Sequence, residues 1–289
     1  MNEIEGFNSN KFYWGFIALL FLIFVAAYHK TLLWMHGRYL SPDSYYSHGY
    51  LIPFVSIYII MQKKKNLKNA IKIPSMWGGG LLIIFAALMH ILGTILYVFS
   101  ISGFSIFFLI LGIVLFLYGY NTAKILLFPI GYLLFMFPVP LFIIIAISFP
   151  MKMLVAQFGV KIVSLLSIPL YREGFHIYIP AGQLLVSNPC SGLRSLIAFM
   201  ALAAVIAHLS EISLLKKIIL FFLSIPIAII SNVLRVASLI LISNFWGLQV
   251  AAPDTIWHTL TGLLVFVIGF IFIYFANWML KWKTSETDI

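Results

Sequence analysis

The chain has 289 residues, of which 63% are hydrophobic and only 9% are charged. A soluble domain carries roughly 25% charged residues and could not bury this much apolar surface, so the composition excludes a soluble protein. The net charge of +10 does not indicate nucleic-acid binding, because the basic residues lie mostly between apolar runs. We expect one polytopic membrane domain over residues 1–289, surrounded by membrane lipids and with no nucleic-acid partner.

Apolar runs of about 20 residues, the length needed to cross a bilayer, recur along the chain. The first is predicted to be a retained helix, because its apolar part is long and no small-residue cleavage site follows it. Pro138 and Pro140 must kink or break the fifth run. The sequence predicts an all-α integral membrane protein of about eight transmembrane helices, at residues 12–34, 45–62, 77–99, 101–120, 125–149, 190–209, 218–245 and 258–280.

The segment 150–189 differs from the rest of the chain. It begins with an amphipathic stretch from Met151 to Ser167 and continues with alternating residues up to Val186. This pattern predicts an interfacial helix followed by a short β-like hairpin, both outside the membrane on the extracytoplasmic side and before the sixth transmembrane helix.

A cluster of lysines at residues 63–72 is the strongest topological signal. Short cytoplasmic loops collect lysine and arginine, and the remaining loops show the same bias when this cluster is placed inside. The predicted topology is therefore a multi-pass protein of the inner membrane with both termini in the cytoplasm. It places Cys190 and His258 at the outer mouths of their helices, facing the periplasm or exterior, and Arg235 within the membrane.

Cys190 is the only cysteine of the chain, which excludes an intrachain disulfide and a metal site with several cysteines. A thiolate is a strong nucleophile, and a nearby imidazole such as that of His258 is able to take its proton and return it to a leaving amine. Arg235 is an ionisable residue inside the bilayer, where such residues mark functional sites, and its guanidinium is suited to stabilising an oxyanion. This chemistry needs no cofactor and no metal.

Each of these residues also has a non-catalytic interpretation. A cysteine near a helix end is most often packing material, and a histidine there is usually an interfacial anchor. Arg235 is also able to pair with Glu173 or Asp254, or to extend its side chain towards an interface.

Four segments of the chain resemble, in order and spacing, the sequence blocks of the exosortase/archaeosortase family. The Cys block is CSGLRS at residues 190–195, the Arg block is NVLRV at 232–236, and His258 opens the last helix. The segment YSHGYLIP at residues 46–53 resembles the N-terminal block of the bacterial exosortases. The resemblance extends over nearly the whole chain.

The resemblance implies a membrane cysteine protease and transpeptidase. Its partners would be secreted precursor proteins with a C-terminal sorting signal, consisting of a Pro-Glu-Pro-like motif, a transmembrane helix and a basic tail. The new carboxyl end would pass to an acceptor that the sequence does not identify. Carried over by position, Cys190 is the nucleophile, Arg235 the transition-state stabiliser and His258 the acid and base.

Arg194, Asn232 and His48 are the supporting or substrate-binding candidates. Arg194 follows Cys190 by four residues, which puts both on one face of a continuous helix. Pro189 suits a first helical turn, and a sulfur near a helix N-terminus is favoured as thiolate. The short polar tail after Lys283 predicts that the additional soluble domain of some exosortases is absent.

One geometric problem follows from the predicted helices. Arg235 would lie ten residues, or about 15 Å, below the end of its helix, whereas Cys190 and His258 would lie at the surface. Either a sunken cavity or a break in the seventh helix would connect them. We expect the cavity, with the sixth helix beginning below the lipid headgroups.

Two other functions stay open on the sequence alone. The first is a transporter or channel that binds an anion through Arg194 and Arg235, although no internal repeat supports it. The second is a non-catalytic assembly factor for exported polysaccharide.

Overall fold

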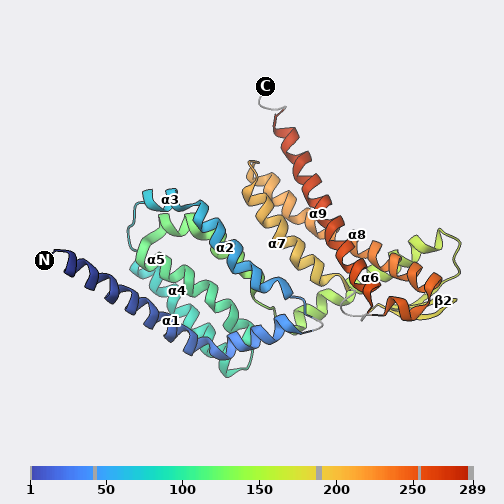
Figure 1. The fold of residues 1–289 in the computed structure, drawn as a ribbon, viewed down its shortest axis with the longest axis horizontal. Helices are drawn as coiled ribbons and strands as arrows, with labels where there is room; N and C mark the ends of the chain where they lie inside the picture. The colour runs from blue at the N-terminus through green and yellow to red at the C-terminus, as the bar shows by residue number, and fades with distance from the viewer. Residues whose placement is uncertain (1, 42–43, 187–190, 253–254, 286–289) are drawn as a thin grey trace. The chain divides into compact units, whose positions relative to one another are not determined.

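The computed structural model describes residues 2–41, 44–186, 191–252 and 255–285 (Figure 1). Within these ranges the chain is helical apart from one small sheet. It divides into two compact units. Unit 1 comprises Met1–Ser41 and Gly49–Pro138, and unit 2 comprises Pro42–His48 and Val139–Ile289. The interpretation of residues 1–289 as one membrane domain stays a prediction.

Six helical segments in the described part of the chain are long and apolar enough to cross a membrane. They confirm an all-α, multi-pass membrane protein. The count of eight is not confirmed, because two predicted spans are shorter: α2 (Leu51–Gln62) has 12 residues and α7 (Leu193–Leu209) has 17. The six segments are Trp14–Leu40, Met76–Ile95, Phe99–Met136, Leu141–Ser164, Leu214–Trp246 and Ile256–Trp282.

Unit 1 is a helical bundle in which α4 and α5 form a tightly packed hairpin. A Cβ atom added to Gly79 would lie 2.4 Å from the backbone nitrogen of Phe116, so only glycine allows this approach. The unit consists of α1 (Asn2–Leu40), the 3₁₀ helix η1 (Ser47–Tyr50) from Gly49 onward, α2, α3 (Lys64–Asn69), α4 (Met76–Ile95), α5 (Phe99–Tyr132) and the 3₁₀ helix η2 (Leu133–Met136).

A hydroxyl network links α1, α4 and α5 inside unit 1. Ser102 Oγ lies 2.6 Å from Thr31 Oγ1 and 2.7 Å from His90 Nδ1. Tyr28 Oη lies 2.8 Å from Ser105 Oγ. In an apolar surrounding each polar group needs such a partner, so these uncharged bonds fix how the three helices pack.

The predicted break between residues 120 and 125 lies at Gly119 instead. Its φ of 78° and ψ of −174° interrupt α5, and an added Cβ would lie 1.7 Å from the carbonyl oxygen of Ile73. Glycine alone tolerates both this backbone and this approach. The break thus comes from a left-handed residue against the α3–α4 loop.

Unit 2 holds the other long helices and the sheet. The predicted break of the run 125–149 at Pro138 and Pro140 is confirmed: its first part forms the end of α5 and η2, and its second part begins α6 at Leu141. The unit contains α6 (Leu141–Ser164), β1 (Tyr171–Glu173), β2 (His176–Ile179), β3 (Gly182–Leu185), α7, α8 (Leu214–Trp246), the 3₁₀ helix η4 (Leu248–Ala251) and α9 (Ile256–Ser285).

The predicted interfacial helix 151–167 is wrong as a separate element. Its residues continue α6 through Pro150 up to Ser164. The amphipathic pattern has another cause: Val155, Ala156 and Val163 are fully buried in a core shared with β2 and α8. One face of α6 therefore packs against protein, while Leu154, Phe158 and Ile162 of the same helix are exposed.

Where a β-like hairpin was expected, the structure has three antiparallel strands in the order β1-β2-β3. Glu173 lies opposite His176 in β1 and β2, and Ile177 lies opposite Leu184 in β2 and β3. Ile177 and Val186 are buried, and they join the sheet to α6 and α8. The strand β3 forms one edge of the sheet.

Candidate functional site

The structure brings Arg235 of α8 and His258 of α9 into direct contact. Nη2 of Arg235 lies 3.0 Å from Nε2 of His258. Both side chains are partly buried. Arginine only donates hydrogen bonds, so Nε2 accepts, and a neutral His258 ring then carries its proton on Nδ1. The two residues, 23 positions apart, form one polar unit.

Local structure fixes His258 in the first turn of α9. Thr255 precedes the helix, and its Oγ1 accepts a hydrogen bond from the backbone N–H of His258 at 3.3 Å. Serine and threonine stabilise helix starts in this way. The hydroxyl of Thr261 donates to the carbonyl of His258 at 2.9 Å. The histidine backbone is therefore held from both sides.

The connection from α8 to α9 explains how a residue deep in α8 reaches a helix start. Arg235 lies eleven residues before Trp246, about 16 Å along the helix axis. After Gly247 the chain returns along α8, because η4 packs on both α8 and β3. This return brings His258 back along α8, and the long side chain of Arg235 spans the remaining distance to it.

The Cys block and the Arg block touch each other through Gly192 and Asn232. Gly192 has a φ of 83°, and an added Cβ would lie 2.7 Å from Nδ2 of Asn232. Asn232 is 1% exposed. The carbonyl of Gly192 accepts bonds from Leu196 N at 2.9 Å and Ser195 Oγ at 2.8 Å. The start of α7 therefore packs directly against Asn232 of the Arg block.

Arg194 and Arg235 line the same small cavity, of about 70 Å³. The cavity lies between α7, α8 and α9, and Gly262 is next to it: an added Cβ there would lie 3.5 Å from Arg235 Nη2. The two arginines that sequence analysis placed within helices thus meet at one site.

Cys190 lies outside the described residues, so its predicted role stays a prediction. The helix predicted from residue 190 begins later, at Leu193, because Gly192 is left-handed. A continuous helix from Cys190 to Arg194 is therefore interrupted at Gly192. The i, i+4 argument that placed these two residues on one helical face is wrong. The shared cavity with Arg235 is what connects Arg194 to the site.

The other candidates lie elsewhere in unit 2. The ring of His48 stacks on Tyr46 with centroids 6.2 Å apart, and the Tyr46 hydroxyl accepts a bond from Val139 N at 3.2 Å. That His48 lines the same mouth stays a prediction. Glu173 accepts a 3.4 Å bond from the Tyr171 hydroxyl, and its charge raises the pKa of Tyr171. Asp254 lies outside the described residues.

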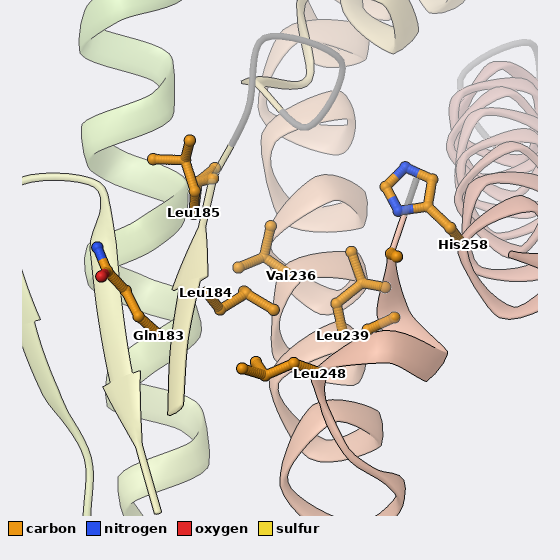
Figure 2. A pocket seen from close by; sticks show the side chains of 10 residues that line it. Gln183, Leu184, Leu185, Val236, Leu239, Leu248 and His258 are labelled. Carbon is orange, nitrogen blue, oxygen red and sulfur yellow. The ribbon is translucent and has the colours of Figure 1, made fainter. Parts of the chain in front are cut away.

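A larger, mostly apolar cavity of about 270 Å³ has His258 in its wall. Figure 2 shows the side chain of Leu184 directed from β3 towards Val236 and Leu239 of α8, with His258 beyond them. Sequence analysis did not predict this cavity, because its lining comes from four separate elements, β3, α8, η4 and α9.

The fold and this site define a multi-pass membrane protein with a partly buried arginine–histidine pair, next to the contact between the Arg block and the block that carries its only cysteine. The family described as Transmembrane exosortase (Exosortase_EpsH) matches residues 34–275, which is most of the chain. The chain belongs to the transmembrane exosortase family. No curated protein and no solved structure matches it significantly.

Proposed function

We propose that this exosortase is a cysteine protease and transpeptidase that cleaves C-terminal sorting signals from secreted precursor proteins. The observation that carries the proposal is the 3.0 Å contact of Arg235 with His258, next to the Gly192–Asn232 contact of the Cys block. The substrates would carry a Pro-Glu-Pro-like motif, a transmembrane helix and a basic tail. An acceptor of unknown identity would receive the cleaved protein.

The proposed reaction has two halves. His258 takes the proton of the Cys190 thiol, and the thiolate attacks the scissile carbonyl carbon. Arg235 stabilises the resulting oxyanion, a contribution of about 2.7–4 kcal/mol for one donor in measured cases. The C–N bond then breaks, the amine leaves with the proton from His258, and a thioester remains on Cys190. Water or an acceptor attacks the thioester and releases the thiol.

The contact between Arg235 and His258 must open before His258 can act as a base in this reaction. Nε2 of His258 accepts a bond from the guanidinium, so it is able to take the thiol proton only after that bond opens. We propose that the scissile carbonyl oxygen of a bound substrate attracts the N–H groups of Arg235 and thereby frees Nε2 before the thiolate attacks. In the absence of substrate, Arg235 holds the histidine in place and the nucleophile is not activated.

The proposed setting is the inner membrane, with both termini in the cytoplasm and the site towards the periplasm or exterior. The lysines of residues 63–72 support this orientation. At the opposite end of unit 2 from the site, Lys216 Nζ donates to Leu280 O at 3.0 Å and Ser210 Oγ to Asn277 Oδ1 at 2.7 Å. These lysine-bearing ends would lie at the cytoplasmic face.

Anion transport is the second candidate, because Arg194 and Arg235 line one cavity. Anion transport does not need the Cys190 thiol, whereas the proposed protease does. A transporter keeps its anion flux in the Cys190→Ser variant, whereas a protease loses precursor processing.

The test is co-expression with a precursor that carries the tripartite tail. Intact protein and the Cys190→Ala variant are compared at equal membrane levels, and precursor size is followed by gel and mass spectrometry. We expect tail loss with the intact protein only. Equal processing by both proteins would rule out Cys190 as the nucleophile, and intact tails in both would contradict the proposed protease activity.

A further inference from the structure

The sheet of unit 2 ends at β3, and this edge borders the cavity that contains His258 (Figure 2). Alternate residues of a strand face opposite sides of a sheet, so a cavity on one face is lined by every second residue. Here four consecutive residues, Gln183 to Val186, line the cavity. The cavity therefore runs along the edge of the strand.

The hydrogen-bond register shows which backbone groups face this edge. Val186 N–H donates to the carbonyl of Phe175, the residue before β2, at 3.0 Å, and Leu184 lies opposite Ile177. In an antiparallel ladder successive residues direct their N–H and C=O groups to opposite sides. The N–H and C=O groups of Gln183 and Leu185 consequently point away from β2, towards the outer edge of the sheet that borders the cavity.

We propose that the precursor's cleavage motif binds as an added fourth strand along β3, an inference that rests on the proposed function. Main-chain bonds to Gln183 and Leu185 would hold the peptide extended, which is how exposed sheet edges bind peptides. Leu184, Val236 and Leu239 would receive its apolar side chains.

The position of the edge supports a peptide occupant. The same cavity includes His258, so a strand bound there continues directly into the candidate catalytic site. On the other side of His258, two guanidinium groups line the smaller cavity and complement a peptide carboxylate. An apolar lining, a backbone edge and adjacent cations together match a short extended peptide with an acidic residue.

A motif with proline at alternate positions suits this mode of binding. Proline has no N–H, so it is accepted in a strand only where the missing group would face away from the ladder. Two prolines separated by one residue both face the same side, and the intervening residue directs its N–H and C=O to the other. Such a peptide offers one complete backbone pair to β3 and none that is wrongly placed.

The protein-side test compares Leu185→Pro with Leu185→Ala in the full chain. Both variants lose the leucine side chain, but only proline removes the outward N–H, and that N–H takes no part in the β2–β3 ladder. We expect kcat/KM for a synthetic tripartite tail to fall at least about tenfold further in the proline variant. Equal kcat/KM in the two variants, with matched thermal unfolding, would overturn the proposal.

The peptide-side test decides the matter if Leu185→Pro fails to fold. The intact enzyme receives a tail whose Pro-Glu-Pro glutamate is N-methylated, and a control tail in which one proline is replaced by N-methylalanine. We expect about tenfold slower cleavage for the first and less than about threefold change for the control. Cleavage of the N-methylglutamate tail at the unmodified rate would overturn strand addition. Failure to cleave even the unmodified tail would instead contradict the proposed function.

Discussion

The two units use buried polar groups differently, and the comparison of His90 with His258 shows how. In unit 1, His90 Nδ1 lies 2.7 Å from the neutral Ser102 hydroxyl, within a network that joins three helices. In unit 2, His258 Nε2 lies 3.0 Å from the charged guanidinium of Arg235 and in the wall of a cavity. The neutral partner of His90 belongs to a helix-packing network, whereas the charged partner of His258 lies at a cavity, as the proposed chemistry requires.

The strongest way to break this comparison is to remove each histidine in turn. We expect His258→Ala to lower precursor processing about 10²–10⁴-fold, the contribution of a general acid and base. His90→Ala should retain the processing rate and lose thermal stability, because it removes a packing bond. Processing rates and unfolding midpoints of both variants in detergent are the measurements. Comparable processing losses in both variants would contradict the division between the units.

The next largest effect concerns the planar donors of arginine. Arg235→Lys keeps the positive charge but loses the guanidinium fork, so we expect processing to fall about 10²–10³-fold with membrane insertion retained. Arg194→Lys is the matched variant, because both arginines line one cavity, and its loss should be smaller. Near-normal turnover of Arg235→Lys, together with a severe loss in Arg194→Lys, would assign the oxyanion role to Arg194.

A smaller loss of processing is expected from Gly192→Ala, and a control glycine separates the effect of backbone strain from that of the contact with Asn232. Gly192→Ala would place a Cβ 2.7 Å from Asn232 Nδ2 at a φ of 83°, and we expect it to lower processing about tenfold by moving the block. Gly174→Ala is the control, since Gly174 has a φ of 61° but nothing within 4 Å of an added Cβ. It should cost similar stability and leave processing unchanged. Equal processing in both would show that the Gly192 contact does not position the site.

Sequence reasoning found most of the apolar helices, because hydrophobic length is a direct physical requirement of the bilayer. It failed where other interactions produce the same pattern. The amphipathic residues around Val155 reflect burial against β2 and α8, and a lipid interface would give an identical sequence signal. The break at Gly119 depends on the approach of Ile73, a contact between separate segments that no local pattern records.

The candidate site was predictable in its members and not in its geometry. Family resemblance gave Arg235 and His258 as partners, and the structure places them in contact. The left-handed backbone of Gly192 interrupts the helical relation assumed for Arg194. The return of residues 247–252 along α8 is a tertiary feature that no local pattern records. The outer position of β3 was missed because a hairpin prediction does not include a third strand or say which strand lies outermost.

In the proposed reaction the precursor acylates Cys190, with His258 as acid and base and Arg235 as stabiliser of the oxyanion. The most direct measurement is intact mass spectrometry of the purified full chain after rapid acid quenching with a tripartite tail peptide. We predict an adduct on Cys190 that has the mass of the N-terminal cleavage fragment and is released by hydroxylamine, as a thioester is. Undiminished cleavage of the same peptide by the Cys190→Ala variant would contradict the account.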